Sequence, residues 1–488
     1  MTLRLELRLP RSRVSLGSEV ALVLTLFNDG DAPVELASLF NNNTITNYVL
    51  TDADDREIVR VNHVTRQLLF EKTEPRTHDE KIHTLAAGGS EQRADNFCRY
   101  HWLERPGTYH LRGLYRFRDI ELLSAPVRFE VEAAPLSNLD TVWLYHYGEK
   151  FLLYSAWIAE AEAAGRELVL RESARFRPQV INYNRVLARP GAPIAPRVAF
   201  HRSLLAGNPT WLSWLEGQEL VCQLASEGQT SAGPFRFRLP GANLRQVLQP
   251  IANADGSLCL LLDWDPGAPQ LFWLKVARDG SELGRAAFPL PASALLLRGV
   301  CDENGGYRLL WFSAATGQLC TQALDLDQGV PSGQVTAFGQ LANAPRALLV
   351  PPVLGSEGYV CSVSTLAQER AVEFAWWSLF EDGSAGPAKV TRAEVPEAAQ
   401  VLDISGELNA QATPFVLVRS HRLLRYVNGS LQQSLEVLKD AELDPAATER
   451  LVITPRNDVY LVTSRPGVGL TERRLHRGTE FDLSEIVE

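Results

Sequence analysis

Hydrophobic and polar residues alternate along the first 133 residues in short stretches that are typical of β-strands. Leucines occupy every second position from Leu3 to Leu9 and again from Leu22 to Leu26, just before the turn sequence Asn28–Asp29–Gly30. Comparable stretches lie at 48–50, 108–115 and 127–131. This spacing predicts an all-β sandwich whose strands each bury one face.

Three segments of this region resemble bacterial immunoglobulin-like domains of the CARDB and proteinase-inhibitor-like type. They are Ser15–Val20 with the following Asn28–Asp29–Gly30 turn, residues 103–109 and residues 124–129. The resemblance implies an immunoglobulin-like β-sandwich domain over residues 1–135. It leaves the function open, because such sandwiches serve adhesion, spacing and inhibition alike.

Between Asn62 and Asn96 the alternation is replaced by polar sequence, which predicts a long loop that acts as a contact surface. The histidines of this stretch, His63, His78 and His83, lack the spacing of metal ligands, so we expect surface histidines and no metal. The segment 40–44, Phe–Asn–Asn–Asn–Thr, is predicted to form a strand-connecting tip that presents amides to a partner.

A repeat of about fifty residues fills the rest of the chain. Turn glycines recur at intervals of 46 to 54 residues, and unit-ending prolines recur at intervals of 49 to 54 residues. The glycines are Gly228, Gly280, Gly329, Gly383, Gly429 and Gly478, and the prolines are Pro190, Pro240, Pro291, Pro345, Pro396 and Pro445. Two markers that keep a constant phase indicate a true structural repeat. The Asp–Gly and Asn–Gly pairs at several of these turns predict two-residue hairpins.

Each repeat unit accommodates four strands. In the third unit the predicted strands are 244–251, 257–264, 270–276 and 282–288, separated by Gly, Asp or Pro. Four antiparallel strands form one blade, so residues 136–488 are predicted to form a seven-bladed β-propeller. Its units are 136–190, 191–240, 241–291, 292–345, 346–396, 397–445 and 446–488. A charged, helix-prone interruption at 159–165 leaves six or eight blades as alternatives.

The propeller cannot be placed in a particular family. The signatures of the tryptophan–aspartate-repeat, Kelch and sialidase-like propellers do not recur in this sequence. The segment Asp325–Gly329 spaces its carboxylates as a calcium loop does, but a single copy without a distal glutamate predicts a turn.

Composition excludes several functional classes. The 488 residues carry a net charge of −10 without a basic stripe, which disfavours nucleic-acid binding. Nucleophile-elbow, Walker and dinucleotide-binding motifs are absent, and no cofactor is implied. We therefore expect no enzyme; the alternative is a glycosidase or lyase whose carboxylates converge from different blades, an arrangement that linear spacing does not reveal. The six cysteines are widely spaced and fit free thiols in a reducing compartment. No stretch approaches the apolar length of a membrane span, and the N-terminus lacks a signal-peptide pattern, so we expect no membrane insertion and a cytoplasmic location.

The predicted binding surface lies at one mouth of the propeller. Loops between the second and third strands supply Trp264, Asp265, Arg370, Arg419, His421 and Arg465, and connections between blades supply Asn243, Arg346 and Glu397. Arginine and tryptophan often dominate the energetics of protein interfaces. We expect a scaffold or adaptor that docks a protein partner in a multiprotein assembly through Trp264, Asp265, Arg346, Arg370, Arg419, His421 and Arg465. A lectin or glycosidase that uses the same mouth is the alternative, with a glycan as its ligand.

Overall fold

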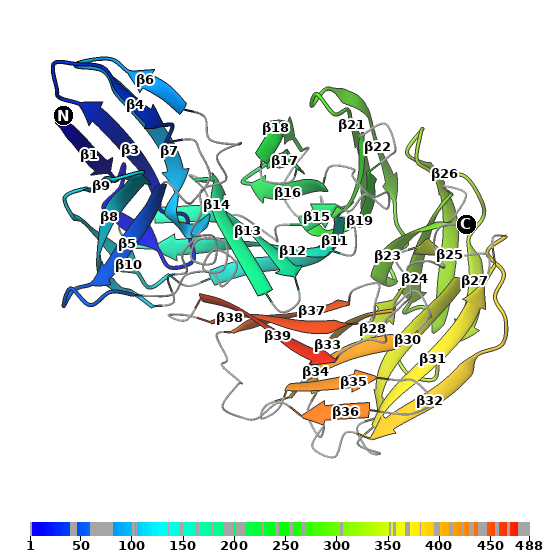
Figure 1. The fold of residues 1–488 in the computed structure, drawn as a ribbon. Helices are drawn as coiled ribbons and strands as arrows, with labels where there is room; N and C mark the ends of the chain where they lie inside the picture. The colour runs from blue at the N-terminus through cyan, green and yellow to red at the C-terminus, as the bar shows by residue number, and fades with distance from the viewer. Residues whose placement is uncertain are drawn as a thin grey trace, which may run out of the picture. The chain divides into compact units, whose positions relative to one another are not determined.

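The computed structural model describes most of the chain. The described residues are 2–39, 46–58, 82–99, 103, 105–134, 136–146, 150–162, 165–176, 179–189, 199–201, 210–226, 229–239, 244–252, 257–264, 270–302, 306–350, 353–354, 358–366, 371–380, 382–394, 401–408, 413–420, 424–428, 434–437, 447–453, 458–465 and 469–476. Their regular structure is β-strand apart from one short 3-10 helix, η1 (Phe97–Arg99), so the all-β prediction is confirmed (Figure 1).

The N-terminal region forms a β-sandwich. One sheet has the order β1 (Leu3–Arg8), β3 (Ala21–Asn28) and β7 (Ser90–Asn96). The other has the order β2 (Arg13–Ser15), β10 (Val127–Glu132), β8 (Gly107–Phe117) and β5 (Thr46–Asp52), with β9 (Ile120–Leu123) on β8. A two-stranded sheet joins β4 (Val34–Ala37) to β6 (Ile82–Leu85).

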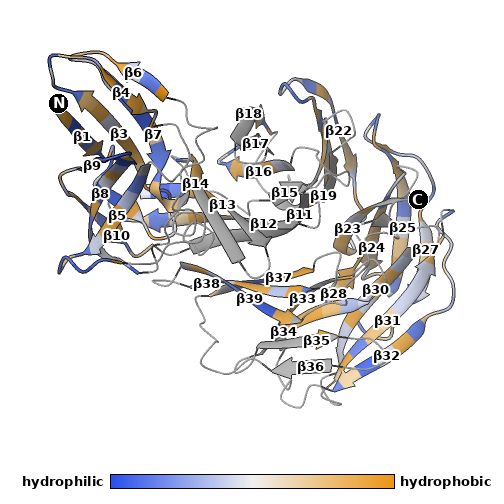
Figure 2. Cartoon of the chain, viewed as in Figure 1, coloured by the Kyte–Doolittle hydropathy of each residue, from blue (hydrophilic) through white to orange (hydrophobic). Residues whose placement is uncertain are grey.

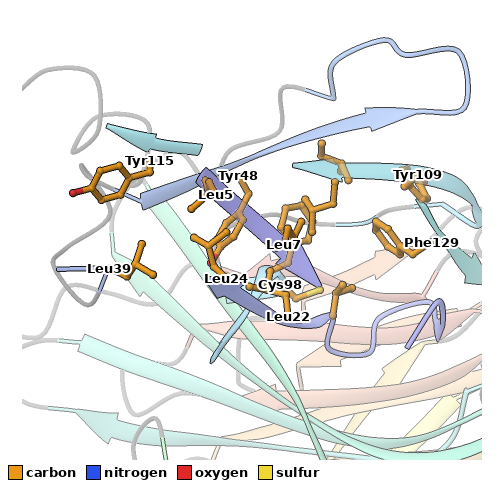
Figure 3. Packing of buried hydrophobic residues seen from close by; sticks show 14 of the residues in the cluster. Leu5, Leu7, Leu22, Leu24, Leu39, Tyr48, Cys98, Tyr109, Tyr115 and Phe129 are labelled. Atoms are coloured by element: carbon orange, nitrogen blue, oxygen red, sulfur yellow. The ribbon is translucent and has the colours of Figure 1, made fainter. Parts of the chain in front are cut away.

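The two larger sheets share one hydrophobic core. Figure 3 shows Leu5, Leu7 and Leu22 from the first sheet together with Tyr48 and Phe129 from the second. Alternate residues of β1 and β3 enter this core, as the leucine pattern predicts, and hydrophilic residues intervene between them along the strands (Figure 2). Removing this apolar surface from water stabilises the sandwich by about 25 cal/mol per Å² buried.

One prediction for this region is wrong. The polar stretch from Asn62 to Asn96 is not a single loop, because β6 and β7 occupy its second half and β7 pairs with β3 throughout. The strand escaped the sequence pattern because polar Arg93 and Asn96 are its buried residues. The first half of the stretch and the predicted tip at 40–44 lie outside the described residues.

From residue 136 onward the chain folds into a succession of mainly antiparallel sheets, one in each predicted repeat unit. In chain order they are β11 (Leu136–His146), β12 (Lys150–Ala161), β13 (Gly165–Phe176) and β14 (Gln179–Ala188); β15 (Ala199–His201), β16 (Thr210–Glu216), β17 (Glu219–Ser226) and β18 (Gln229–Arg238); β19 (Leu244–Ala252), β20 (Leu258–Trp264), β21 (Gln270–Val276) and β22 (Glu282–Pro289); β23 (Ala294–Asp302), β24 (Tyr307–Ser313), β25 (Gln318–Asp325), β26 (Val330–Pro331) and β27 (Thr336–Gln340), joined by β29 (Val353–Leu354); β28 (Ala347–Leu349), β30 (Gly358–Leu366), β31 (Ala371–Leu379) and β32 (Lys389–Glu394); β33 (Val401–Leu408), β34 (Pro414–Ser420), β35 (Leu424–Asn428) and β36 (Ser434–Val437); and β37 (Thr448–Ile453), β38 (Val459–Arg465) and β39 (Gly469–His476).

The predicted strands of the third unit match β19 to β22 within two residues at every boundary. The expected helix-prone interruption at 159–165 is not helical where the structure describes it. Instead β12 extends to Ala161 and pairs with Gly165, the first residue of β13. The strand pairing extends further than helix propensity suggested, since apolar residues of both strands, such as Trp157 and Val169, are buried.

The order of the strands within these sheets is that of propeller blades. Each four-stranded sheet is a meander, and in one of them β29 lies between β28 and β30 along the chain but pairs with β23 of the preceding sheet. The first strands of successive sheets contact one another: β15 with β19, β19 with β23, β23 with β28, β28 with β33 and β33 with β37. The all-β fold and this succession of sheets fit a β-propeller.

The Asp–Gly turns differ from the predicted two-residue hairpins. Gly280 has φ +86°, but Asp279 does not share the left-handed conformation that a two-residue turn of this type would need. Instead the Gly280 N–H donates to Ala277 O at 2.9 Å and the Ala277 N–H donates to Ser281 O at 2.8 Å. The Asp279 carboxylate accepts the Ser281 N–H, which lowers the pKa of Asp279 and favours the wider turn.

The chain divides into two compact units. The first comprises Met1–Ser137, Lys150–Gly191 and Ser464–Leu470, and the second comprises Asn138–Glu149, Ala192–Thr463 and Thr471–Glu488. The sandwich therefore shares its unit with β12, β13 and β14. Within the described residues there is no helix whose length and apolar composition would suit a membrane crossing.

Candidate interaction surfaces

An open groove runs along one side of the N-terminal sandwich, between β1 and β9. Among the described strands, β1 is the end strand of its sheet and β9 pairs only with β8. The groove has a volume of about 350 Å³, and its apolar lining consists of Leu3, Leu5, Leu7, Leu122, Leu123 and Ala125. Leu123 is 48% exposed, so the groove presents apolar surface to solvent beside the edges of two strands.

Charged side chains accompany this groove on the outer face of β1. Arg4 Nε donates to Asp29 Oδ2 at 2.8 Å, and Arg4 Nη1 donates to Glu6 Oε2 at 3.2 Å. The bond to Asp29 raises the pKa of Arg4, and the bond from Arg8 lowers the pKa of Glu6. The side chains of Arg4 and Glu6 therefore both stay charged near neutral pH.

The strand β7 carries two paired polar side chains, Arg93 and Asp95, in another part of the sandwich. Arg93 Nη2 lies 2.8 Å from Asp95 Oδ2, which also accepts a hydrogen bond from Tyr48 Oη at 2.9 Å. Arg93 Nη1 donates to the Leu39 carbonyl at 2.7 Å. Because Arg93 and Asp95 are nearly buried and mutually paired, they fix the strand in place rather than offer a free charged site.

Glu167 of β13 is the centre of a buried polar cluster in the first unit. Its side chain is 3% exposed and accepts hydrogen bonds from Ser18 Oγ at 2.7 Å and Arg11 Nη1 at 3.0 Å. Arg189 Nε donates to the same carboxylate at 3.2 Å. These contacts fasten the β12–β14 sheet to the segment between β1 and β3.

The structure describes four of the nine predicted propeller-mouth residues, namely Trp264, Arg346, Arg419 and Arg465. Trp264 and Arg465 end β20 and β38, the second strands of their sheets, and Arg419 is the penultimate residue of the second strand β34. The three thus occupy similar topological positions, on the strands rather than in the loops where they were predicted. Asp265, Arg370 and His421, as well as Asn243 and Glu397, lie outside the described residues.

Arg419 and Arg346 are the predicted residues whose side chains are described. Arg419 Nη1 lies 3.4 Å from Glu449 Oε2, whose side chain is 4% exposed and belongs to the first strand of the next sheet. Arg346 is exposed immediately before β28, and its backbone N–H donates to Val363 O at 2.7 Å. Arg419 therefore forms an ion pair across the junction of two sheets, and Arg346 is held through its backbone.

His83, His110 and the acidic turn at Asp325 have ordinary structural partners. His83 Nε2 lies 3.6 Å from Glu91, and His110 Nδ1 lies 3.4 Å from Asp55. In the predicted acidic turn, Asp325 Oδ1 accepts the Asp327 N–H at 2.8 Å. Within the part of the chain that the structure describes, no three His, Cys, Asp or Glu side chains are grouped as a metal site requires.

Comparison with known proteins finds similarity among solved structures alone. No family model matches the chain, and no curated protein matches its sequence. Among solved structures, BBS1N in complex with ARL6DN is 15% identical with a TM-score of 0.38, covering 71% of this chain and 94% of its own. A candidate 6-phosphogluconolactonase from Bacteroides uniformis is 14% identical with a TM-score of 0.38, covering 68% and 91%. A puromycin hydrolase mutant is 14% identical with a TM-score of 0.36, covering 74% and 58%. These structures are of the β-propeller type.

The groove beside β1 was not predicted from the sequence. The alternation of leucine with charge along β1 identified the strand, but the exposed Leu123 belongs to β9, which pairs with β8. Only the order of strands within the two sheets shows that β1 and β9 are both open at one side of the sandwich. A sequence signal for such an edge is the pair of arginines and the glutamate on the solvent face of β1.

Proposed function

We propose that the protein is a non-enzymatic scaffold or adaptor that docks protein partners through its sandwich and through the strand-end loops of its repeated sheets. The observation that carries this proposal is the groove between β1 and β9, where the exposed side chain of Leu123 adjoins a strand edge. A strand edge offers backbone hydrogen bonds to an extended segment, and neighbouring apolar side chains supply the remaining affinity.

The proposed architecture is an immunoglobulin-like sandwich over residues 1–135 and a seven-bladed propeller over 136–488. The Tyr109 hydroxyl donates to the Arg105 carbonyl at 2.7 Å, which is the bond of a tyrosine corner in immunoglobulin-like sandwiches. The presence of one sheet in each fifty-residue unit supports the seven blades. In this proposal the sandwich and the propeller are separate docking platforms on one chain.

The second proposed platform is the set of loops that follow the second strands. Arg419 supports it because Glu449 fixes the guanidinium before any partner arrives, and a side chain that is already ordered loses less entropy on binding. We assign Trp264, Asp265, Arg346, Arg370, Arg419, His421 and Arg465 to this surface. The proposed location is the cytoplasm, which the free, buried cysteines Cys98, Cys222, Cys259, Cys320 and Cys361 support.

Affinity purification from the native cells tests the function. The tagged chain is compared with Leu123→Glu, which places a charge in the groove, and with Leu283→Glu, which does so at a leucine of β22 that is 54% exposed. We expect a stoichiometric protein that the wild-type chain and Leu283→Glu retain and that Leu123→Glu loses. Recovery of the same proteins with all three chains, or of no protein with any of them, would contradict the proposal.

A further inference from the structure

We infer that the groove receives the β1 strand of a second copy of this chain, so that two sandwiches join through an antiparallel β1–β1 pair. This inference rests on the proposed function, because it names the occupant of the groove in which that function places a protein partner. It follows from three properties of β1: the direction of its backbone groups, its charge order and the leucines beside it.

The backbone groups of the odd-numbered residues of β1 point toward the open edge. The Asp29 N–H donates to the Thr2 carbonyl at 2.9 Å, and the register continues with Leu3 opposite Asn28. In an antiparallel pair, residues that exchange hydrogen bonds with the neighbouring strand alternate with residues that do not. Arg4 and Glu6 are therefore in phase with Thr2, whereas the N–H and C=O groups of Leu3, Leu5 and Leu7 face away from β3.

This phase restricts how a second β1 strand can pair. A symmetric antiparallel ladder must place outward-facing residues opposite one another, as in Leu5 opposite Leu5 and Leu3 opposite Leu7. The same register puts Arg4 of each copy opposite Glu6 of the other, at the close spacing of a non-hydrogen-bonded pair. A shift by two residues would oppose Arg4 with Arg4 in one direction and Glu6 with Glu6 in the other. The charges therefore favour this register over both of its neighbours. A shift by four residues would pair Glu6 with Arg8 instead, but the overlap would then run past the end of β1 at Arg8.

The apolar surface of the groove suits the same arrangement. Leu5 and Leu7 point inward and are 5% and 4% exposed, so the equivalent leucines of a second strand would extend the same inner face. That face adjoins Leu122 and Leu123 of β9, which line the groove. Pairing would thus cover the half-exposed Leu123 side chain and fill the open edge of β1 in one step.

Sedimentation analysis of purified full-length chains over a concentration series tests the inference. We expect wild-type protein to shift from the 54.1 kDa monomer toward a species of twice that mass. Arg4→Glu and Glu6→Arg should each weaken this self-association by about tenfold or more, since each turns two attractive pairs into repulsive ones. The double variant Arg4→Glu/Glu6→Arg restores opposite charges and should recover the dimer.

A matched control separates this pairing from general charge effects. Glu130→Arg makes the same change of charge at a glutamate of β10 that is 46% exposed and ion-paired with Arg13, and it should dimerise as the wild type does. A wild-type chain that stays monomeric at every concentration would overturn the inference, as would a double variant that stays dissociated. If the chain is monomeric while Leu123→Glu still loses another protein in the affinity purification, that protein occupies the groove and the proposed function stands. If the chain dimerises but captures no other protein, the inference stands and the adaptor function fails.

Discussion

Gly329 lies directly over the indole ring of Trp273 in the preceding sheet. A Cβ atom at position 329 would be 2.3 Å from Trp273 Cδ2, and the backbone of Gly329 has φ +67°. The same relationship joins Gly280 to Phe235, with 1.9 Å to the ring, and Gly383 to Arg308, with 2.8 Å to the guanidinium. The fifty-residue glycine period thus has a packing cause, since at these three turns the chain rests on a side chain of the sheet before.

Replacement of Gly329 should reveal this packing. Gly329→Ala must accept both a left-handed backbone and a clash with Trp273, so we expect it to lower the free energy of unfolding by about 2–4 kcal/mol. Gly217→Ala is the matched control, because Gly217 has φ +60° but no atom within 4 Å of the added Cβ. Its cost should be about 1 kcal/mol. Equal losses in urea unfolding of the two variants would contradict the packing account.

The repeat could be predicted from the sequence because part of its cause is local, although the packing of Gly329 on Trp273 joins neighbouring sheets. Glycine permits a turn and proline fixes φ at its own position, and apolar strands can be recognised from their residue types. The strand β7 could not be predicted, since its inward residue Arg93 is balanced by Asp95 and by the carbonyl of Leu39. The sequence gives no sign that Arg93 will bond to the carbonyl of Leu39, 54 residues away.

The candidate site residues also divide into features that the sequence indicated and features that it did not. Sequence order placed Trp264, Arg419 and Arg465 in the loops after second strands, and the structure has them at or next to the ends of those strands. The prediction came this close because strand boundaries follow largely from the local pattern. The ion pair between Arg419 and Glu449 and the open edge of β1 depend on which strands become neighbours. Those strand pairings depend on the whole fold, so the spacing of residues in the sequence does not predict them.

The carboxylate of Glu167 should be important for stability. Glu167→Ala leaves the hydroxyl of Ser18 and two arginines without their acceptor, and we expect a loss of about 1–3 kcal/mol in the free energy of unfolding. The control is Glu160→Ala, which removes an exposed partner of Arg166 and should cost at most about 1 kcal/mol. Thermal or urea unfolding measures both. A Glu167 variant as stable as the Glu160 variant would show that the cluster contributes no more than a surface ion pair.

Alkaline pH should weaken the fold through its buried thiols. Burial raises the pKa of Cys98 to about 12. A raised pKa means that the neutral thiol stabilises the fold below the unfolded-state pKa of about 8.5, and that this contribution is lost as pH rises toward 12. The loss should be about 1.4 kcal/mol per pH unit for each such thiol.

Cys98→Ala isolates this contribution. The stability difference between wild type and variant should shrink by about 2–3 kcal/mol between pH 8.5 and about pH 10.5, since other titrating groups affect both chains equally. Urea unfolding at the two pH values measures it. A difference that does not change with pH would refute the assignment of the shift to the buried thiol.

Arg419 should contribute to partner capture from the repeated sheets. Arg419→Ala removes a guanidinium that Glu449 holds in place, and retention of a propeller-bound partner should fall by about tenfold or more. Arg392→Ala is the control, because Arg392 is 53% exposed and ion-paired with Glu373 on adjacent strands of one sheet. Quantitative mass spectrometry of the retained proteins compares the two variants, with thermal unfolding to confirm that both are folded. Equal retention by the two variants would remove Arg419 from the interface.

The most direct test of the account is photo-crosslinking from position 123 in the native cells. A photoreactive amino acid in place of Leu123 should form a discrete covalent adduct with a polypeptide, identified by mass spectrometry, because a protein segment lies in the groove. The same amino acid at position 283, at a similarly exposed leucine of β22, should give no such adduct. A crosslinked peptide from this chain would identify a second copy, and one from another protein would identify a different partner. Absence of any adduct at position 123, or the same adducts at both positions, would contradict the claim that the protein works by docking proteins at the edge of its sandwich.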